Sequence, residues 1–239
     1  MKYIVLFFSI LLFQLSIQAQ DQPVVVELFT SQGCSSCPPA DALLEDIHNK
    51  YGDDVILLSY HVDYWNYIGW KDPFSSKQMT QRQYNFASSI QSRNVYTPQA
   101  VINRRTHFTG SNSSKMNQSI AYYKNKSNSG SVNIISATKN KEDVQIQLNT
   151  VGIPENAIIT AAVTVKDRTT AVSRGENRSR TLKNTHIVAG VRDLKSDNHS
   201  KNISIDVADW VKDTDILEAV VYVQTSENGI ITAAKTAIN

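Results

Sequence analysis

The sequence predicts an α/β domain at residues 22–126, followed by an all-β, sandwich-like domain at residues 130–239. In the first part, β-branched apolar segments alternate with segments whose apolar residues recur at helical spacing, the pattern of an α/β sheet. A polar run of Lys, Asn, Ser and Gly at residues 124–130 then indicates a linker. Beyond it, short alternating segments recur about every ten residues, which is typical of a small β-sandwich.

The first part is expected to follow the order β, α, β, α, β, β, α. Leu43, Ile47 and Tyr51 recur at helical spacing in the first helix. Ser75 or Ser76 is expected to cap the second helix. The expected segments are strand 23–30, helix 39–51, strand 55–64, helix 76–92, strands 99–103 and 106–109 with a turn at 103–105, and helix 113–126.

The second part shows apolar and polar residues in short alternating segments. A charged run at residues 174–180 reads as a hairpin tip with solvated charges or, alternatively, as a docking surface. His186 has no evident partner and is interpreted as structural. The expected strands are 132–134, 144–148, 158–165, 203–207, 217–223 and 230–234.

The N-terminus has the features of a secretory signal peptide at residues 1–20. A single positive charge at Lys2 precedes an apolar run at residues 4–15, and small residues follow near Ala19. The run is too short for a transmembrane helix, which needs about 20 apolar residues. We therefore expect cleavage near Ala19 or Gln20, export of the chain, and no membrane span in the mature protein.

The net charge and the cysteine content limit the possible functions of the protein. The formal net charge is +2, and signal removal takes away Lys2, so a near-neutral chain offers no electrostatic case for nucleic-acid binding. Both cysteines, Cys34 and Cys37, lie in one four-residue window. A bridge over so short a loop removes little entropy from the unfolded chain. Chemistry is therefore a better reason for the pair than stability.

The cysteine pair lies where the first strand passes into the first helix. The free N–H groups and the positive dipole end of a helix stabilise a thiolate, and such motifs lower the cysteine pKa to roughly 3.5–7.5. Cys34 is then expected to be the nucleophile, with the more exposed and more acidic sulfur. Cys37 is expected to resolve the mixed disulfide.

These residues resemble the thioredoxin superfamily. The carriers of the resemblance are the strand ending at residues 27–30, the Cys34–Cys37 motif, and Thr97-Pro98 some sixty residues later. The resemblance implies a cis Pro98 beside the cysteines and a backbone at Thr97–Pro98 that receives a substrate peptide. The thioredoxin pattern lacks its first β-α unit here. Glu27 stands one residue further from the cysteines than the buried acid of thioredoxin.

A closer resemblance is to an uncharacterised bacterial secreted family, domain of unknown function 1223. It covers about residues 24–239 and implies export to the periplasm or out of the bacterial cell. The segments that carry it are 26–41, 61–65, 96–100, 174–177 and 220–224. The resemblance supplies no substrate.

Polar and aromatic residues follow the second strand, at the edge of an α/β sheet where sites form. His61 and Asp63 are candidates for tuning the disulfide, with ordering of the loop as the alternative. Trp65, with Tyr67 and Trp70, is a candidate wall of a peptide-binding groove, or else covers a core edge.

The leading hypothesis is an exported thiol–disulfide oxidoreductase that acts on exported protein thiols and disulfides or on small thiols. It needs no organic cofactor and no metal, because the cysteines hold the electrons. The alternative is a non-catalytic binding module or a copper chaperone that uses the same cysteines, with His61 or Met79 as further ligands. The β domain is expected to dock a partner, to dimerise or to shield the site.

Overall fold

The computed structural model describes residues 24–92, 94–126, 130–196 and 201–239, and the predicted signal peptide at 1–20 lies outside them. The helices are α1 (Pro38–Tyr51), α2 (Lys77–Ser89) and α3 (Ser113–Lys124), with 3-10 turns at Gly52–Asp54 and Asn66–Ile68. The strands are β1 (Val24–Thr30), β2 (Val55–His61), β3 (Gln99–Ile102), β4 (Thr106–Thr109), β5 (Ser131–Lys139), β6 (Asp143–Val151), β7 (Ile158–Ala171), β8 (Thr181–Lys195), β9 (Lys201–Asp206), β10 (Leu217–Thr225) and β11 (Gly229–Ala237).

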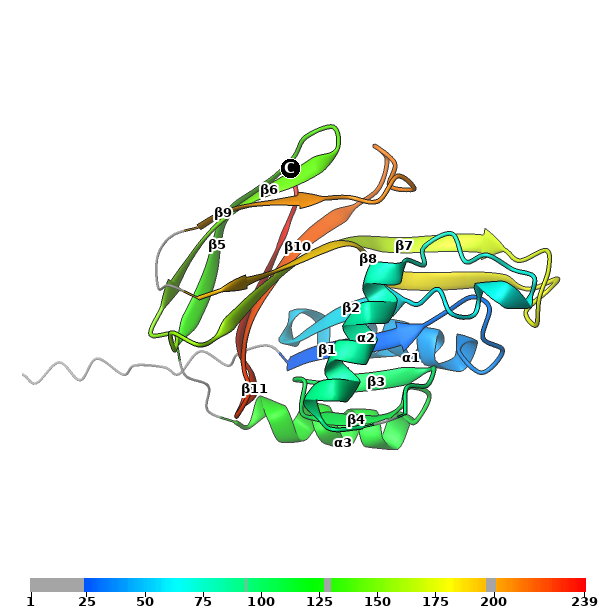
Figure 1. Ribbon diagram of the computed structural model, residues 1–239, viewed down its shortest axis with the longest axis horizontal. Coiled ribbons are helices and arrows are strands. Elements are labelled where there is room, and N and C mark those ends of the chain that lie inside the picture. The colour runs from blue at the N-terminus through cyan, green and yellow to red at the C-terminus, as the bar shows by residue number, and fades with distance from the viewer. Residues whose placement is uncertain (1–23, 93, 127–129, 197–200) are drawn as a thin grey trace, which may run out of the picture.

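Two sheets organise the chain (Figure 1). Eight strands form one mixed sheet in the order β11-β10-β7-β8-β2-β1-β3-β4, and β5-β6-β9 form an antiparallel sheet. The order β, α, β, α, β, β, α predicted for the first part is confirmed. Ser76 caps α2, since its side chain accepts a hydrogen bond from the backbone N–H of Met79 at 3.3 Å.

Helices cover both faces of the large sheet, and β1 is therefore buried on both sides. Successive side chains of a strand point to opposite faces. Val24, Val26 and Leu28 pack in one cluster with α1 and α3, whereas Val25 and Phe29 pack in another with α2. In Figure 1, α2 lies in front of this part of the sheet.

Strand β8 joins the two parts of the chain. It pairs in parallel with β2, with Ser59 opposite Ile187, and in antiparallel fashion with β7. Our sequence analysis predicted no strand here, which is wrong. Residues 184–191 are all buried, so this stretch lacks the polar–apolar alternation of a half-exposed strand. The large sheet therefore includes strands from both sides of the predicted linker.

The small sheet packs against one face of the large sheet to form a second apolar core. Ile146, Leu148 and Ile203 of the small sheet share this core with Val163 and Val221 of the large sheet. The predicted sandwich thus draws one of its two layers from the large sheet.

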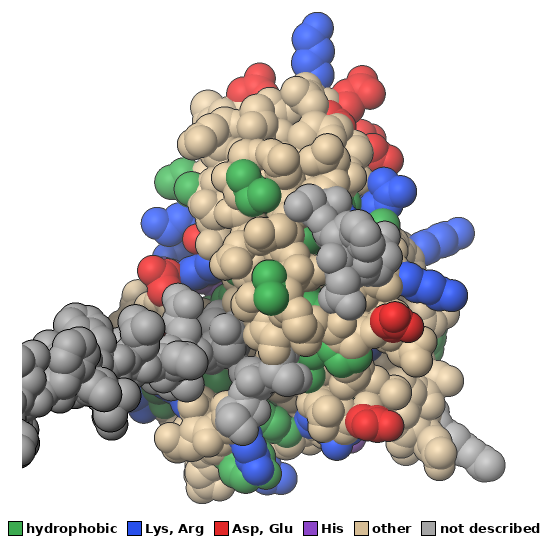
Figure 2. Space-filling model, turned by 90° about the vertical axis from the view of Figure 1, so that its left-hand side faces the viewer, with side chains coloured by type: hydrophobic (Ala, Val, Ile, Leu, Met, Phe, Trp, Pro, Cys, Tyr) green, Lys and Arg blue, Asp and Glu red, His purple; other side chains and the backbone are tan. Residues whose placement is uncertain are grey.

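On the face shown in Figure 2, neither positive nor negative side chains form a patch. Lys and Arg side chains alternate there with Asp and Glu, and hydrophobic side chains are scattered singly. Across the described ranges, every helix is too short or too polar to cross a bilayer.

Gly190 allows β8 to pass close to β9, and Gly190→Ala is expected to destabilise the fold. A Cβ at Gly190 would lie 2.4 Å from the carbonyl oxygen of Asp206. Overpacking of this kind costs about 3 kcal/mol, which urea unfolding would measure. The control is Gly52→Ala, where a Cβ meets no atom within 4 Å and only the positive φ of 54° is unfavourable, at a cost of about 1 kcal/mol. Equal losses would contradict this account.

Candidate functional site

The two cysteines form a disulfide at the start of α1. Their Cα atoms are 5.4 Å apart. Cys37 is the N-cap residue, and its carbonyl oxygen accepts from the N–H groups of Ala40 and Asp41 at 2.8 and 3.1 Å. Pro38 occupies the first helical turn, where its missing N–H removes no helix hydrogen bond. The cysteine pair therefore lies at the strand-to-helix junction that the sequence indicates.

Both cysteines are buried, so the expectation of a more exposed Cys34 is wrong. Cys34 is 1 % exposed and Cys37 is 0 % exposed. The loop at residues 172–180, between β7 and β8, hydrogen-bonds to the backbone of the cysteine turn, and we call it the covering loop. Its Asn177 donates to the backbone oxygens of Gln32 and Cys34, at 2.9 Å each. Its Glu176 accepts from the N–H of Ser35 at 3.1 Å.

The charged side chains of residues 174–180 are exposed at the tip of the β7–β8 hairpin, as predicted, and the buried Asn177 also docks this tip on the cysteine turn. Asn177 is fully buried, and its Oδ1 accepts a hydrogen bond from Arg180 at 3.1 Å. Hydrogen bonds from Ser35 hold the pKa of the Glu176 carboxyl below its usual range. Of the three roles predicted for the second part of the chain, shielding of the cysteines is the one that this contact supports.

Thr97, Pro98 and Trp65 lie around the cysteine turn. The Thr97–Pro98 peptide bond is cis. The indole N–H of Trp65 donates to Thr97 Oγ1 at 2.7 Å, and a Cβ added at Gly33 would lie 3.0 Å from Trp65 Cβ. A Cβ at Gly110 would lie within 3.3 Å of both Ala40 in α1 and Pro98. Trp65 and Gly110 thus connect Thr97–Pro98 to the segment that carries the cysteines.

The other aromatic residues of the same loop divide into two kinds. Trp70 donates to the side-chain oxygen of Gln32 at 3.2 Å, so it supports the turn before Cys34. Tyr67 is 83 % exposed and projects from the loop.

Two of the three candidate tuning residues lie away from the cysteines. Glu27 faces α2, on the side of the sheet opposite α1, and binds Arg82, Arg104 and Tyr222. Asp63 accepts from Thr80 Oγ1 at 2.6 Å, and its own N–H donates to the same oxygen. Asp63 therefore orders the start of α2, the alternative that we gave for it.

His61 does connect to the cysteine turn, through Asp72. His61 Nδ1 lies 2.7 Å from Asp72 Oδ2, and that oxygen also accepts from the N–H of Gln32 at 2.8 Å. Burial raises the pKa of Asp72, but the charge and hydrogen bond of His61 outweigh it and hold that pKa below its usual range. Burial lowers the pKa of His61, and the charge of Asp72 outweighs burial and raises it.

Sequence reasoning missed Asp41, which lies beside His61. Burial raises its pKa to about 7, against the lowering effect of the His61 charge. Asp41 follows Cys37 by four residues, and residues four apart share one face of a helix. That spacing is the signal that could have identified it.

Asp41 belongs to a set of buried groups that we call the buried polar cluster. Its His61 Nε2 has no hydrogen-bond partner within the part of the chain that the structure describes, whereas the side chains of Thr30 and Asn184 lie close enough to the Asp41 carboxyl to lower its pKa. An unpaired buried polar atom is costly, so such atoms commonly mark a functional role. The cluster consists of Thr30, Asp41, His61, Asp72 and Asn184.

The fold and the site define an α/β protein with a helix-capping disulfide, extended by a small β-sheet. The chain belongs to the family described as protein of unknown function (DUF1223), which matches residues 25–224. The chain is similar to protein AGR_C_4864 from Agrobacterium tumefaciens, known from a crystal structure. The identity is 30 %, the TM-score is 0.67, and the match covers 89 % of this chain and 92 % of that one.

A weaker match is a β-glucuronidase from Ruminococcus gnavus in complex with D-glucuronic acid. The identity is 11 % and the TM-score is 0.26, over 46 % of this chain and 16 % of that one. A likeness of this size supports no conclusion. No curated protein matches the chain.

Asp41→Asn is expected to flatten the pH dependence of stability between about pH 4 and pH 7. The folded protein keeps the proton up to about pH 7, whereas the unfolded chain loses it near 3.8. Folding therefore takes up a proton, and the contribution of Asp41 to the free energy of unfolding falls as pH rises, by roughly 1.4 kcal/mol per pH unit. Urea unfolding across this range measures the slope. Asp46→Asn, at an exposed position of the same helix, should leave it unchanged. Equal slopes in the wild type and Asp41→Asn would refute the assignment.

Proposed function

We propose that the protein is an exported, thioredoxin-like thiol–disulfide oxidoreductase that works through Cys34 and Cys37. Its substrates would be exported protein thiols and disulfides or small thiols. The observation that carries the proposal is a disulfide across the first turn of α1 with a buried carboxyl group four residues further on. The neighbouring Thr97 and Trp65, both half-buried, offer a surface for a substrate peptide, with Pro98 buried beside them.

The exchange proceeds in two displacements. A substrate thiolate attacks Cys34 Sγ, the Cys34–Cys37 bond breaks, and Cys37 leaves as a thiolate. A second substrate thiolate then attacks the substrate sulfur of the mixed disulfide and releases the Cys34 thiolate. The substrate becomes a disulfide, and its two electrons remain on the cysteine pair. The reverse sequence reduces a substrate disulfide.

Asp41 supplies the proton that the departing Cys37 sulfur needs. Its carboxyl, with a pKa raised to about 7, is more acidic than an ordinary thiol at about 8.5. It therefore gives its proton to the Cys37 thiolate as the mixed disulfide forms. In the reverse direction the Asp41 carboxylate takes the proton from Cys37. Such general acid–base help contributes typically about 10²–10⁴-fold.

Access to Cys34 requires the covering loop to move away. The loop holds the cysteine turn through polar contacts from Asn177 and Glu176. Each such hydrogen bond contributes only about 1 kcal/mol net, because water can replace the partner. These hydrogen bonds together therefore contribute only a few kcal/mol to holding the loop on the cysteine turn.

The alternative is a non-catalytic binding module with a structural disulfide, and the burial of both sulfurs favours it. The copper-chaperone form has less support. Met79 packs in the cluster on the α2 face of the sheet, and Nδ1 of His61 is bound to Asp72. Among the described residues, no three His, Cys, Asp or Glu side chains gather closely enough to hold a metal ion.

The reduction potential and a trapping experiment test the proposal. Equilibration with glutathione should give a potential between about −270 and −120 mV, the span of known exchange catalysts. Cys37→Ser should accumulate a mixed disulfide with a disulfide-containing peptide, because Cys34 attacks and no resolving thiol follows. Cys34→Ser should accumulate none. A potential below about −300 mV, with no trapped adduct, would leave the structural disulfide as the function of the pair.

Loosening the covering loop is expected to speed reduction of the disulfide. Asn177→Ala removes both hydrogen bonds to the cysteine turn, and a loss of about 1.4 kcal/mol corresponds to roughly tenfold faster reduction. Stopped-flow reduction by dithiothreitol measures the rate, and thermal unfolding checks that the fold persists. Asn133→Ala, at an exposed position of β5, is the control. An unchanged rate in a folded Asn177→Ala protein would show that the loop does not limit access.

A further inference from the structure

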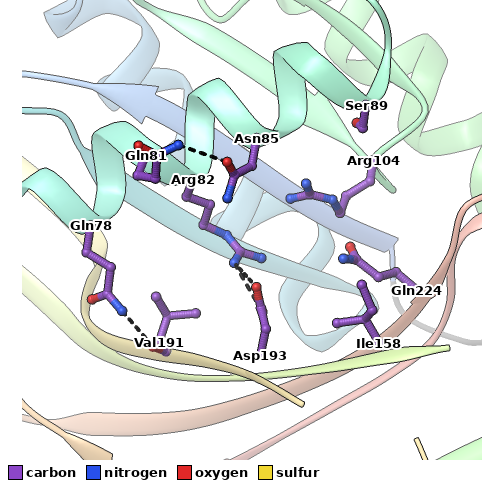
Figure 3. Close-up of a pocket in the computed structure, with 10 residues that line it drawn as sticks. All are labelled: Gln78, Gln81, Arg82, Asn85, Ser89, Arg104, Ile158, Val191, Asp193 and Gln224. Carbon is purple, nitrogen blue, oxygen red and sulfur yellow. Dashed lines mark hydrogen bonds and ion pairs between the residues drawn. The ribbon is translucent and has the colours of Figure 1, made fainter. Parts of the chain in front are cut away.

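A cavity of about 520 Å³ lies on the α2 face of the large sheet (Figure 3). Its walls are the polar side of α2, the β3–β4 turn, and residues of β7, β8 and β10. The cysteines lie at the start of α1, on the other face. Nothing in the proposed redox chemistry uses this cavity, so the inference below does not depend on that chemistry.

Arg104 reaches this cavity from a turn that is held from two sides. Asn103 and Arg104 have φ values of 47° and 54°, the left-handed region that few residues other than glycine adopt. The side chain of Asn103 accepts from the N–H of Val25 at 2.8 Å, and its carbonyl oxygen accepts from the N–H of Ile230 at 3.0 Å. Positive φ values at both central residues are those of a type I′ hairpin turn, and these contacts fix the backbone from which Arg104 projects.

One edge of the Arg104 guanidinium remains open. Its Nη1 donates to both carboxylate oxygens of Glu27, at 3.2 and 3.3 Å. No residue of the described ranges accepts from its Nε or Nη2. In Figure 3 the guanidinium points into the cavity, between Asn85 and Gln224. The Nε and Nη2 hydrogens of arginine form a planar fork that matches the two oxygens of a carboxylate.

Asp193 provides the opposite charge in the same cavity. Its carboxylate accepts from Nη1 of Arg82 at 3.2 Å and from Thr160 at 2.7 Å, and its side chain is 49 % exposed. Arg82 is fully engaged, because it also donates to Glu27 and to the hydroxyl of Tyr222. Asp193 can therefore accept a further donor from a ligand.

The charges around the cavity balance. Arg82 and Arg104 carry two positive charges, and Glu27 and Asp193 carry two negative charges. A ligand with a net charge would unbalance these partly buried groups, whereas a ligand with separated opposite charges meets both poles. Between the poles lie amide side chains, and Oε1 of Gln224 is buried without a partner in the described part of the chain. Amides of this kind suit a peptide group.

We propose that this cavity binds a small zwitterion, a free amino acid or a dipeptide. The carboxylate of the ligand binds the open edge of Arg104, and its ammonium group binds Asp193. Asn85 and Gln224 lie where they can hydrogen-bond the polar atoms between the two ends. The volume falls within the usual range of small-molecule sites, about 300–1,000 Å³.

Isothermal titration calorimetry of the exported chain with glycylglycine tests the proposal. Saturable binding is expected in the wild type. Arg104→Lys keeps the positive charge beside Glu27 but lacks the fork, and should weaken binding about tenfold or more. Asn85→Ala changes an exposed helix position and should also weaken binding without loss of the fold. Gln118→Ala, an exposed amide of α3 with a similar hydrogen bond within its helix, should bind as the wild type does.

Two further ligands test the carboxylate and the ammonium group separately. Glycinamide lacks the carboxylate and N-acetylglycine lacks the ammonium group, so both should bind at least tenfold more weakly than glycylglycine. The proposal is overturned by the absence of saturable binding to glycylglycine, by equal binding of glycinamide, or by an unchanged affinity in Arg104→Lys. Equal binding of N-acetylglycine would overturn the role of Asp193 and hence the zwitterion.

Discussion

The parallel pairing of β8 with β2 is the constraint on which the rest of the structure depends. It places the second part of the chain in the same sheet as the first, with Ser59 opposite Ile187. The covering loop, which enters β8, therefore lies on the cysteine turn. Further along the same strand, Asn184 enters the buried polar cluster and Asp193 reaches the cavity on the other face. One strand pairing thus contributes to both sites.

The two faces of the sheet bury charge in different ways. On the α2 face, Glu27 receives hydrogen bonds from Arg82, Arg104 and Tyr222, so its charge is compensated. On the α1 face, burial raises the pKa of Asp41 to about 7, although the charge of His61 and the neighbouring Thr30 and Asn184 lower it. A carboxyl group whose pKa lies near 7 can exchange protons at neutral pH. Glu27 therefore suits a structural role and Asp41 a chemical one.

Features that depend on residues close together in the sequence could be predicted, and features that depend on residues far apart in the sequence could not. The Cys34–Cys37 junction and the cap at Ser76 depend on neighbours within a few residues, and the sequence analysis placed the junction and narrowed the cap to Ser75 or Ser76. The contact between Asn177 and Cys34 joins residues 143 positions apart, and it rests on β8, whose fully buried stretch hides its strand period. The spacing of Asp41 from Cys37 can be read from the sequence. Its raised pKa, however, depends on burial among strands that only the fold brings together.

A disulfide covered by a loop differs from a disulfide enclosed in an apolar core. An inert bridge is held within apolar packing that only unfolding can open. Here Cys34 is covered where Asn177 and Glu176 hydrogen-bond to the backbone of the turn, and the intervening Ser35 and Ser36 are exposed. Water can satisfy those backbone groups when the loop moves, so opening leaves none of them unpaired. Under the proposed function, reaching Cys34 therefore requires local opening of the covering loop and not unfolding of the rest of the chain.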